Sequence, residues 1–242
     1  LPSCSQTLSN INEQSTALEK VQQLHTNGND KAQQTAIANA FFDAARLNQT
    51  DVIQFFIDKQ YDLDQQDNKG RTALMLASAA GHSQLIQQLT QADASLSITD
   101  QQGQSALAWA SLRQQYSAVD ALLKAGADVN QTHVDGATAF FYAASTGNLE
   151  LMKQLQAQGA DIHIQLKESG MNALMLAIHQ GRLDMARWLL DQGMDIEVGN
   201  RAGVTPLMMA IDQNQTAIFF DLLKRDASIN AENQSGWNPL MY

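Results

Sequence analysis

Apolar and polar positions recur along almost the whole chain with a near-constant period. Each period opens with a polar stretch that contains a glycine, continues with a short apolar segment, and closes with a segment whose apolar residues stand three and four positions apart. A fixed period of this size predicts a stacked array of two-helix units. The marking glycines stand 33, 33, 34, 33 and 33 residues apart, at Gly70, Gly103, Gly136, Gly170, Gly203 and Gly236.

Each unit is predicted to hold two helices. Two residues after the glycine comes a threonine, serine or asparagine, and these residue types favour the N-cap of a helix. The first helix then carries a leucine or phenylalanine, followed three residues later by an alanine small enough to let neighbouring helices approach closely. We expect this helix to end at Gly81, Gly147 and Gly181, with Gln114 and Asn214 taking the same place in other units.

One phrase follows every glycine: GRTALMLA, GQSALAWA, GATAFFYA, GMNALMLA, GVTPLMMA and GWNPLMY. Together with the later Leu-Leu and Gly-Ala-Asp segments, it resembles the ankyrin repeat, whose pattern contains Gly-x-Thr-Pro-Leu-His. The resemblance implies an all-α fold, an α-solenoid of stacked ankyrin helix-turn-helix repeats with short β-hairpin fingers. Proline occurs in the phrase only at Pro206 and Pro239, and histidine is absent from it.

The repeat frame sets the expected domain boundaries. Residues 1–33 form an N-terminal lead with an extra helix from about Ser9 to His25, and residues 34–242 form the ankyrin repeat domain. One extra residue is expected within 165–169, in an exposed finger where an insertion is tolerated. The repeats are a degenerate first one, 34–66, full repeats 67–99, 100–132, 133–166, 167–199 and 200–232, and a partial last one, 233–242.

The place of the missing histidine is filled by large or flexible apolar side chains in most repeats. Two interpretations are open: these side chains pack between neighbouring first helices, or they form a soft apolar stripe on the concave surface. The residues are Met75, Ala108, Phe141, Met175, Met208 and Met241.

Charge and composition exclude several classes of function. The 242-residue chain has a formal net charge of −10, which disfavours nucleic acid as a partner and favours encounter with a basic protein partner. No apolar run is long enough to span a membrane. The five histidines fall at different places in the repeat frame, and neither a metal-binding spacing nor a nucleophile-elbow motif is present. We therefore predict no catalytic residue, no metal site and no cofactor, and a protein that is not an enzyme.

The resemblance implies a protein–protein interaction module that binds through finger tips and the exposed side of the first helices. Arginine and tryptophan are enriched among residues that dominate binding energy, which draws attention to Arg71, Arg113 and Arg201. We expect a monomer that binds a protein partner. The candidate partner-binding residues are Lys69, Arg71, Gln102, Gln104, Leu112, Arg113, Val134, Asp135, Phe141, Met171, His179, Arg201, Val204 and Trp237.

The first four residues suggest a narrower role. Leu1-Pro2-Ser3-Cys4 resembles the end of a bacterial lipoprotein signal, in which Cys4 would be lipidated, although a chance match explains the segment equally well. The lipoprotein interpretation places the protein in the periplasm, as an accessory or immunity protein that neutralises a secreted effector or toxin enzyme. The competing interpretation is a cytoplasmic protein without an anchor.

Overall fold

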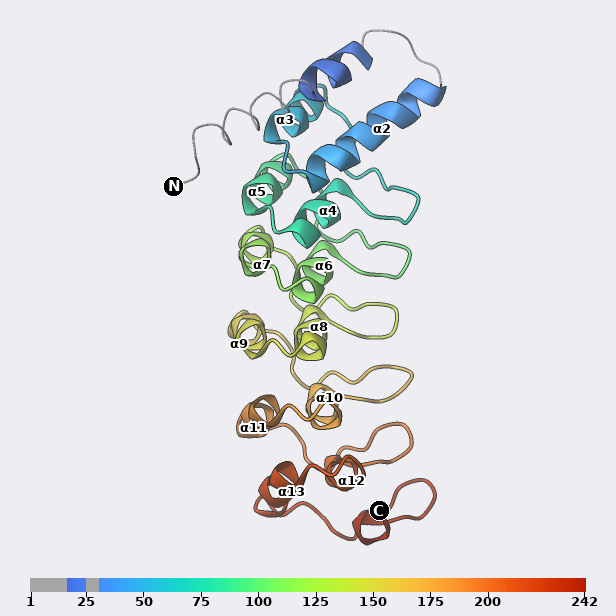
Figure 1. The fold of residues 1–242 in the computed structure, drawn as a ribbon, viewed down its shortest axis with the longest axis vertical. Helices are drawn as coiled ribbons and strands as arrows, with labels where there is room; N and C mark the ends of the chain where they lie inside the picture. The colour runs from blue at the N-terminus through green and yellow to red at the C-terminus, as the bar shows by residue number, and fades with distance from the viewer. Residues whose placement is uncertain (1–16, 25–30) are drawn as a thin grey trace. The chain divides into compact units, whose positions relative to one another are not determined.

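A computed structural model describes residues 17–24 and 31–242, and the chain divides into two compact units, Leu1–Asp128 and Val129–Tyr242. Within the described ranges the regular secondary structure is entirely helical (Figure 1). The first unit contains a helix over residues 17–24 and then α2 (Lys31–Arg46), α3 (Thr50–Asp58), α4 (Ala73–Ala80), α5 (Ser83–Gln91), α6 (Ala106–Leu112) and α7 (Tyr116–Lys124). The second contains α8 (Ala139–Thr146), α9 (Leu149–Ala157), α10 (Ala173–His179), α11 (Leu183–Asp191), α12 (Pro206–Asp212), α13 (Thr216–Leu223) and the 3-10 helix η1 (Pro239–Met241).

In each unit the first helices of successive repeats pack on one another, and so do the second helices. In the first unit α4 lies between α2 and α6, while α5 lies between α3 and α7. In the second unit α10 packs against α8 and α12, and α11 packs against α13 (Figure 1). Each unit is therefore a stack of helical pairs, as the period predicts.

Local sequence signals set the ends of the first helices, as expected. Thr72 Oγ1 accepts a hydrogen bond from the backbone N–H of Met75, and the equivalent Ser105, Thr138, Asn172 and Thr205 do the same in their repeats. Among the residues that the structure describes, six helix-ending or turn positions adopt a left-handed backbone without being glycine, including Gln114 at φ 56° and Asn214 at φ 54°. The prediction that these two residues replace a helix-ending glycine is confirmed.

The residues in the place of the missing histidine belong to the core. Met75, Ala108, Met175 and Met208 are buried between neighbouring helices, so packing is the correct interpretation for them. Phe141 is only 8% exposed, so its side chain is not presented as a partner-binding surface. Met241 differs, at 58% exposed, because the described chain places no further first helix over it.

The first repeat departs from the others. Helix α2 has 16 residues where later first helices have seven or eight, and it begins ahead of the boundary expected at residue 34. Phe41, Phe56 and Tyr61 pack as an aromatic cluster, with ring centroids 4.9 to 5.2 Å apart. Of the extra helix expected from Ser9 to His25, residues 17–24 are helical and the remainder lies outside the described residues.

The fingers are short hairpin-shaped loops, and no residue within 17–24 or 31–242 is a β-strand residue. Their tight turn is closed by a side chain that stands three residues before the glycine. Asp67 Oδ1 accepts hydrogen bonds from the backbone N–H groups of Lys69 and Arg71, both at 2.9 Å. Asp100, Asn200 and Asn233 hold their own fingers in the same way.

Successive fingers within a unit are joined through their backbones. The N–H of Gln101 donates to the carbonyl of Lys69 at 3.1 Å in the first unit. In the second unit Lys167 donates to Asp135 at 2.7 Å, Arg201 to Ser169 at 2.8 Å, and Gln234 to Ala202 at 2.9 Å. Each finger therefore supports the next one.

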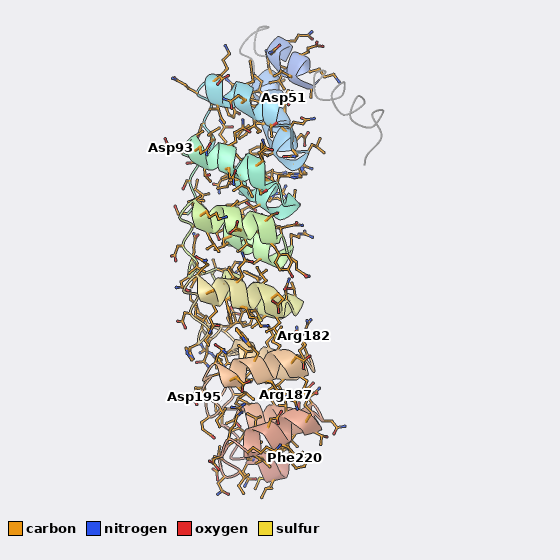
Figure 2. The ribbon with its side chains drawn as sticks, turned by 90° about the vertical axis from the view of Figure 1, so that its left-hand side faces the viewer. Asp51, Asp93, Arg182, Arg187, Asp195 and Phe220 are labelled. Atoms are coloured by element: carbon orange, nitrogen blue, oxygen red, sulfur yellow. The ribbon has the colours of Figure 1, made fainter. Side chains whose placement is uncertain are left out.

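Ion pairs join second helices on the other side of the stack. Arg187 on α11 donates through Nε to Asp221 on α13 at 2.7 Å, and Arg225 pairs with Asp191. Figure 2 shows Arg187 among the side chains of this row of helices.

Candidate functional site

The fingers project from the side of the first helices, away from the second helices (Figure 1). Most of the predicted partner-binding residues lie on this finger and first-helix side at different depths. Exposed ones are Lys69, Gln102, Arg113, Val134, His179, Arg201 and Trp237. Half-buried ones are Arg71, Leu112, Asp135, Met171 and Val204. Gln104 is only 8% exposed, as is Phe141, so neither side chain is accessible to a partner.

A shallow groove of about 410 Å³ opens on this side of the first unit, and we name it the arginine groove. The end of α2, the first finger, α4 and the end of α6 form its walls. Its lining residues are Arg46, Arg71, Met75, Leu76, Ala79, Ala80, Trp109, Arg113 and Gln115. Two of the sequence-predicted residues, Arg71 and Arg113, thus lie at one site although they are more than one repeat apart.

Arg71 is held in place by the finger turn. Its Nε and Nη2 donate to Asp67 Oδ2 at 2.8 and 2.6 Å. Burial of Asp67 opposes its ionisation, but the hydrogen bonds from the Arg71 side chain and from the backbone N–H groups of Arg71 and Lys69 outweigh burial, so the pKa of Asp67 lies below its ordinary value. Asp67 therefore stays ionised at neutral pH and fixes the Arg71 guanidinium at the groove wall.

Arg113 has a different environment. Its guanidinium carbon lies 5.6 Å from the centroid of the Trp109 ring, an arrangement typical of a cation–π contact. In the part of the chain that the structure describes, no carboxylate lies within ion-pair distance of Arg113. Arg46, the third arginine, pairs with Asp43 at 2.7 Å. The groove thus contains two partnered guanidinium groups and one that faces solvent.

Trp109 is fixed from behind the groove. Its indole Nε1–H donates to Asp100 Oδ2 at 3.0 Å, and the other oxygen of this buried carboxylate closes the second finger. Neither Trp109 nor Arg46 was among the residues predicted from the sequence. Trp109 was missed because its place in the repeat holds leucine, methionine or tyrosine in the other glycine-marked units, so the sequence gives no signal that this side chain reaches the surface.

The arginine groove adjoins a larger hollow at the N-terminal end of the first unit. This hollow measures about 1040 Å³ and lies between α2 and the first finger, and it shares Arg46 and Arg71 with the groove. Its other lining residues include Thr35, Ala38 and Phe42. The two depressions together make one extended surface.

On the finger and first-helix side of the second unit, several predicted residues already contact other residues of the same unit. Arg201 donates from Nη2 to the carbonyl of Lys167, so it links two fingers. His133 Nδ1 bonds Asp135 Oδ1 at 2.8 Å, and its ring packs edge-on against Tyr142. Among the predicted positions, Val134 is 66% exposed and Trp237 is 52% exposed, and the Trp237 ring packs edge-on against Tyr242.

The described residues contain no group of three or more His, Cys, Asp or Glu side chains placed to hold a metal ion. Among the helices that the structure describes, none has both the length and the apolar character needed to cross a membrane. Cys4 lies outside the described residues, so its lipidation stays a prediction.

Comparison with known proteins is consistent with this geometry. The family model for ankyrin repeats in three copies matches residues 12–100, 41–133 and 140–233. Among solved structures, the chain is similar to the ankyrin repeat domain of Bcl-3, described as a unique member of the IkappaB protein family. The TM-score is 0.76 at 25% identity, over 83% of this chain and 92% of that one. No curated protein sequence matches the chain.

Proposed function

Because this chain belongs to the ankyrin repeat family, whose domains are protein–protein interaction modules, we propose that it binds a protein partner through the finger and first-helix surface. A partner that binds here in an interface of standard size would cover about 800 Å² of this surface. In the first unit, the arginine groove and the adjoining hollow are depressions of this surface with room for side chains of a partner.

The observation that carries this proposal is the position of Arg113. Arg113 is an exposed arginine that stacks on a fixed tryptophan and has no acidic partner in the described residues. Arginine and tryptophan are two of the three residue types most enriched at the centre of interfaces. Residues that build the stack, such as Leu107 and Ala110 in the same helix, are buried instead. Helix α6 thus uses its buried residues to pack against neighbouring helices, while Trp109 and Arg113 face the groove.

A matched pair of double variants tests the proposal. The surface variant Lys69→Glu with Arg113→Glu reverses two charges on the finger and first-helix side. The control Lys59→Glu with Lys124→Glu makes the same charge change at the ends of second helices α3 and α7. Wild type, surface variant and control are each used to capture partners from the native organism, and captured proteins are identified by mass spectrometry.

We expect wild type and control to capture a common partner that the surface variant loses, with all three showing similar thermal unfolding. Equal capture by the surface variant and the control would refute the assignment of this face.

A narrower role is proposed from the sequence of the N-terminus. Leu1-Pro2-Ser3-Cys4 supports a lipid-anchored periplasmic protein that neutralises a secreted effector. Cells that express the full reading frame are labelled with an alkynyl fatty acid, and wild type is compared with Cys4→Ala. Label on wild type and its loss from the variant would support the anchor, and unlabelled wild type would exclude it.

A further inference from the structure

We infer that the arginine groove is a carboxylate subsite, which binds a glutamate or aspartate side chain from an acidic segment of the protein partner. The inference rests on the proposed function and names the chemistry of the partner. The net charge of −10 led to the expectation of a basic partner, whereas the groove calls for an acidic segment. The reason is that the groove is positively charged although the chain as a whole is negatively charged.

The lining of the groove is electropositive. Three of its described lining residues are arginines, and none is an aspartate or glutamate. Asp43 and Asp67 partly balance Arg46 and Arg71, and these two carboxylates line the adjoining hollow rather than the groove. The positive charge that remains belongs to Arg113, at the end of α6.

Two guanidinium groups are oriented before any ligand binds. Nε and Nη2 of Arg71 donate to Asp67 Oδ2, and within the described residues Nη1 of Arg71 makes no hydrogen bond. The Trp109 ring supports the Arg113 guanidinium, and Trp109 is itself anchored to Asp100. A planar guanidinium that is already held loses little conformational entropy when it binds a carboxylate.

The floor of the groove suits the stem of an acidic side chain. The apolar lining consists of Met75, Leu76, Ala79, Ala80 and the half-buried Trp109. Apolar walls reduce the local dielectric screening, so an ion pair formed here is stronger than one on an open surface. The two methylene groups of a glutamate would pack on this floor while its carboxylate meets Arg113.

Charge complementarity favours an acidic peptide over nucleic acid. Duplex DNA carries one phosphate charge for about every 1.7 Å of its axis, so it would meet the acidic remainder of the protein as well as the groove. A peptide with a few carboxylates presents its charge locally. The groove has room for such a side chain. The adjoining hollow beside α2, which Asp43 and Asp67 also line, extends the surface for an uncharged part of the segment.

A peptide titration tests the inference. The probe is a short acetylated and amidated peptide of glutamate and leucine, and its neutral counterpart has glutamine in place of glutamate. Binding is followed by the indole N–H resonance of Trp109, assigned with Trp109→Phe, in isotope-labelled full-length protein. Inorganic phosphate is titrated separately as a competitor.

We expect the glutamate peptide to shift the Trp109 resonance and the glutamine peptide to leave it unchanged. Arg113→Gln should raise the Kd by tenfold or more, on the order expected when a hydrogen bond between charged groups is lost. Lys124→Gln removes the same charge from α7 in the same unit and should leave the Kd unchanged. Arg113→Lys keeps the charge without the planar fork and should give an intermediate Kd.

Three results would overturn the inference: equal binding of both peptides, an unchanged Kd for Arg113→Gln, or displacement of the peptide by phosphate at comparable concentration, which would indicate a phosphate ligand. Failure here is distinguishable from failure of the proposed function. If the glutamate peptide does not bind while Lys69→Glu with Arg113→Glu still loses its captured partner, the carboxylate subsite is wrong and the interaction surface stands.

Discussion

The guanidinium group of Arg182 lies directly over Gly147, where an added Cβ atom would come within 0.8 Å of Nη1. Gly147 ends α8 in a left-handed conformation at φ 77°, and Arg182 precedes the second helix of the following repeat. Arg182 is among the side chains labelled in Figure 2. Glycine is therefore needed at position 147 for two reasons: it adopts the left-handed backbone conformation, and its lack of a Cβ atom lets the Arg182 side chain approach closely.

Gly147→Ala should therefore lower the free energy of unfolding by about 1–2 kcal/mol from the left-handed backbone, with a further loss from displacement of Arg182. Gly159→Ala is the control, since Gly159 has φ 87° but no atom within 4 Å of its added Cβ. Urea unfolding measures the free energy of unfolding of both variants. The additional loss of stability in Gly147→Ala should vanish when Arg182→Ala is also present. Equal losses of stability in Gly147→Ala and Gly159→Ala would argue against the contact between Arg182 and Gly147.

Gln60→Gly should stabilise the protein. Gln60 adopts φ 53° at a turn where later repeats have Gly126, Gly159 and Gly193. Relief of the left-handed strain outweighs the extra entropy of glycine in the unfolded chain, so we expect a gain of about 0.5–1 kcal/mol in urea unfolding. Gly126→Ala is the reciprocal change and should destabilise. A loss of stability in Gln60→Gly would show that the glutamine side chain contributes more than the backbone strain.

Asp67→Asn should make stability less dependent on acid pH. The pKa of Asp67 is lowered in the folded state, so its ionisation stabilises the fold above the unfolded-state pKa of about 3.9, and this contribution is lost as pH falls through the folded-state pKa. Asparagine keeps the turn, as Asn200 and Asn233 do, but loses the ion pair with Arg71. At neutral pH the free energy of unfolding of wild type should exceed that of the variant by about 1 kcal/mol.

Unfolding measured from neutral pH down to strong acid checks this prediction. The difference between wild type and Asp67→Asn should shrink below about pH 4. A difference that stays constant over the whole range would exclude ionisation of Asp67 as its source.

Charge reversal at Arg113 and at Arg201 should have different effects on stability. Arg113 is exposed and makes one ring contact, so Arg113→Glu should leave the Tm nearly unchanged. Arg201 donates to the carbonyl of Lys167, so Arg201→Glu should lower the free energy of unfolding by about 0.5–1.5 kcal/mol. Calorimetry of the two single variants separates the effects, and equal Tm values would contradict the finger contact.

The fold was predictable because its signals are local and repeated. Thr72 and its equivalents cap helices through bonds that span three residues, and Ala77 is buried in the same way as Ala110 and Ala177. The hydrogen bonds between fingers are not local in this sense. Bonds such as that from Gln101 to Lys69 run between neighbouring fingers, and too few of them follow in series to form a regular strand.

The grouping of residues at the candidate site could be predicted only in part. The repeat frame predicted that Arg71 and Arg113 lie on the finger and first-helix side, and both line the arginine groove. It could not show that Asp67 holds Arg71 while Arg113 stacks on Trp109, because these contacts depend on the side-chain directions of residues in different elements. For the same reason Gln104 looked accessible in the frame, whereas its side chain is buried.

The backbone bonds between successive fingers have a consequence for the kinetics of recognition. A loop that is already tied to its neighbour, as the finger of Ser169 is to that of Arg201, needs no ordering when a partner arrives. Little entropy is then lost in forming the complex, and encounter is limited by diffusion and orientation rather than by loop rearrangement. Changes at the exposed positions should accordingly alter how long a partner stays bound more than how fast it arrives.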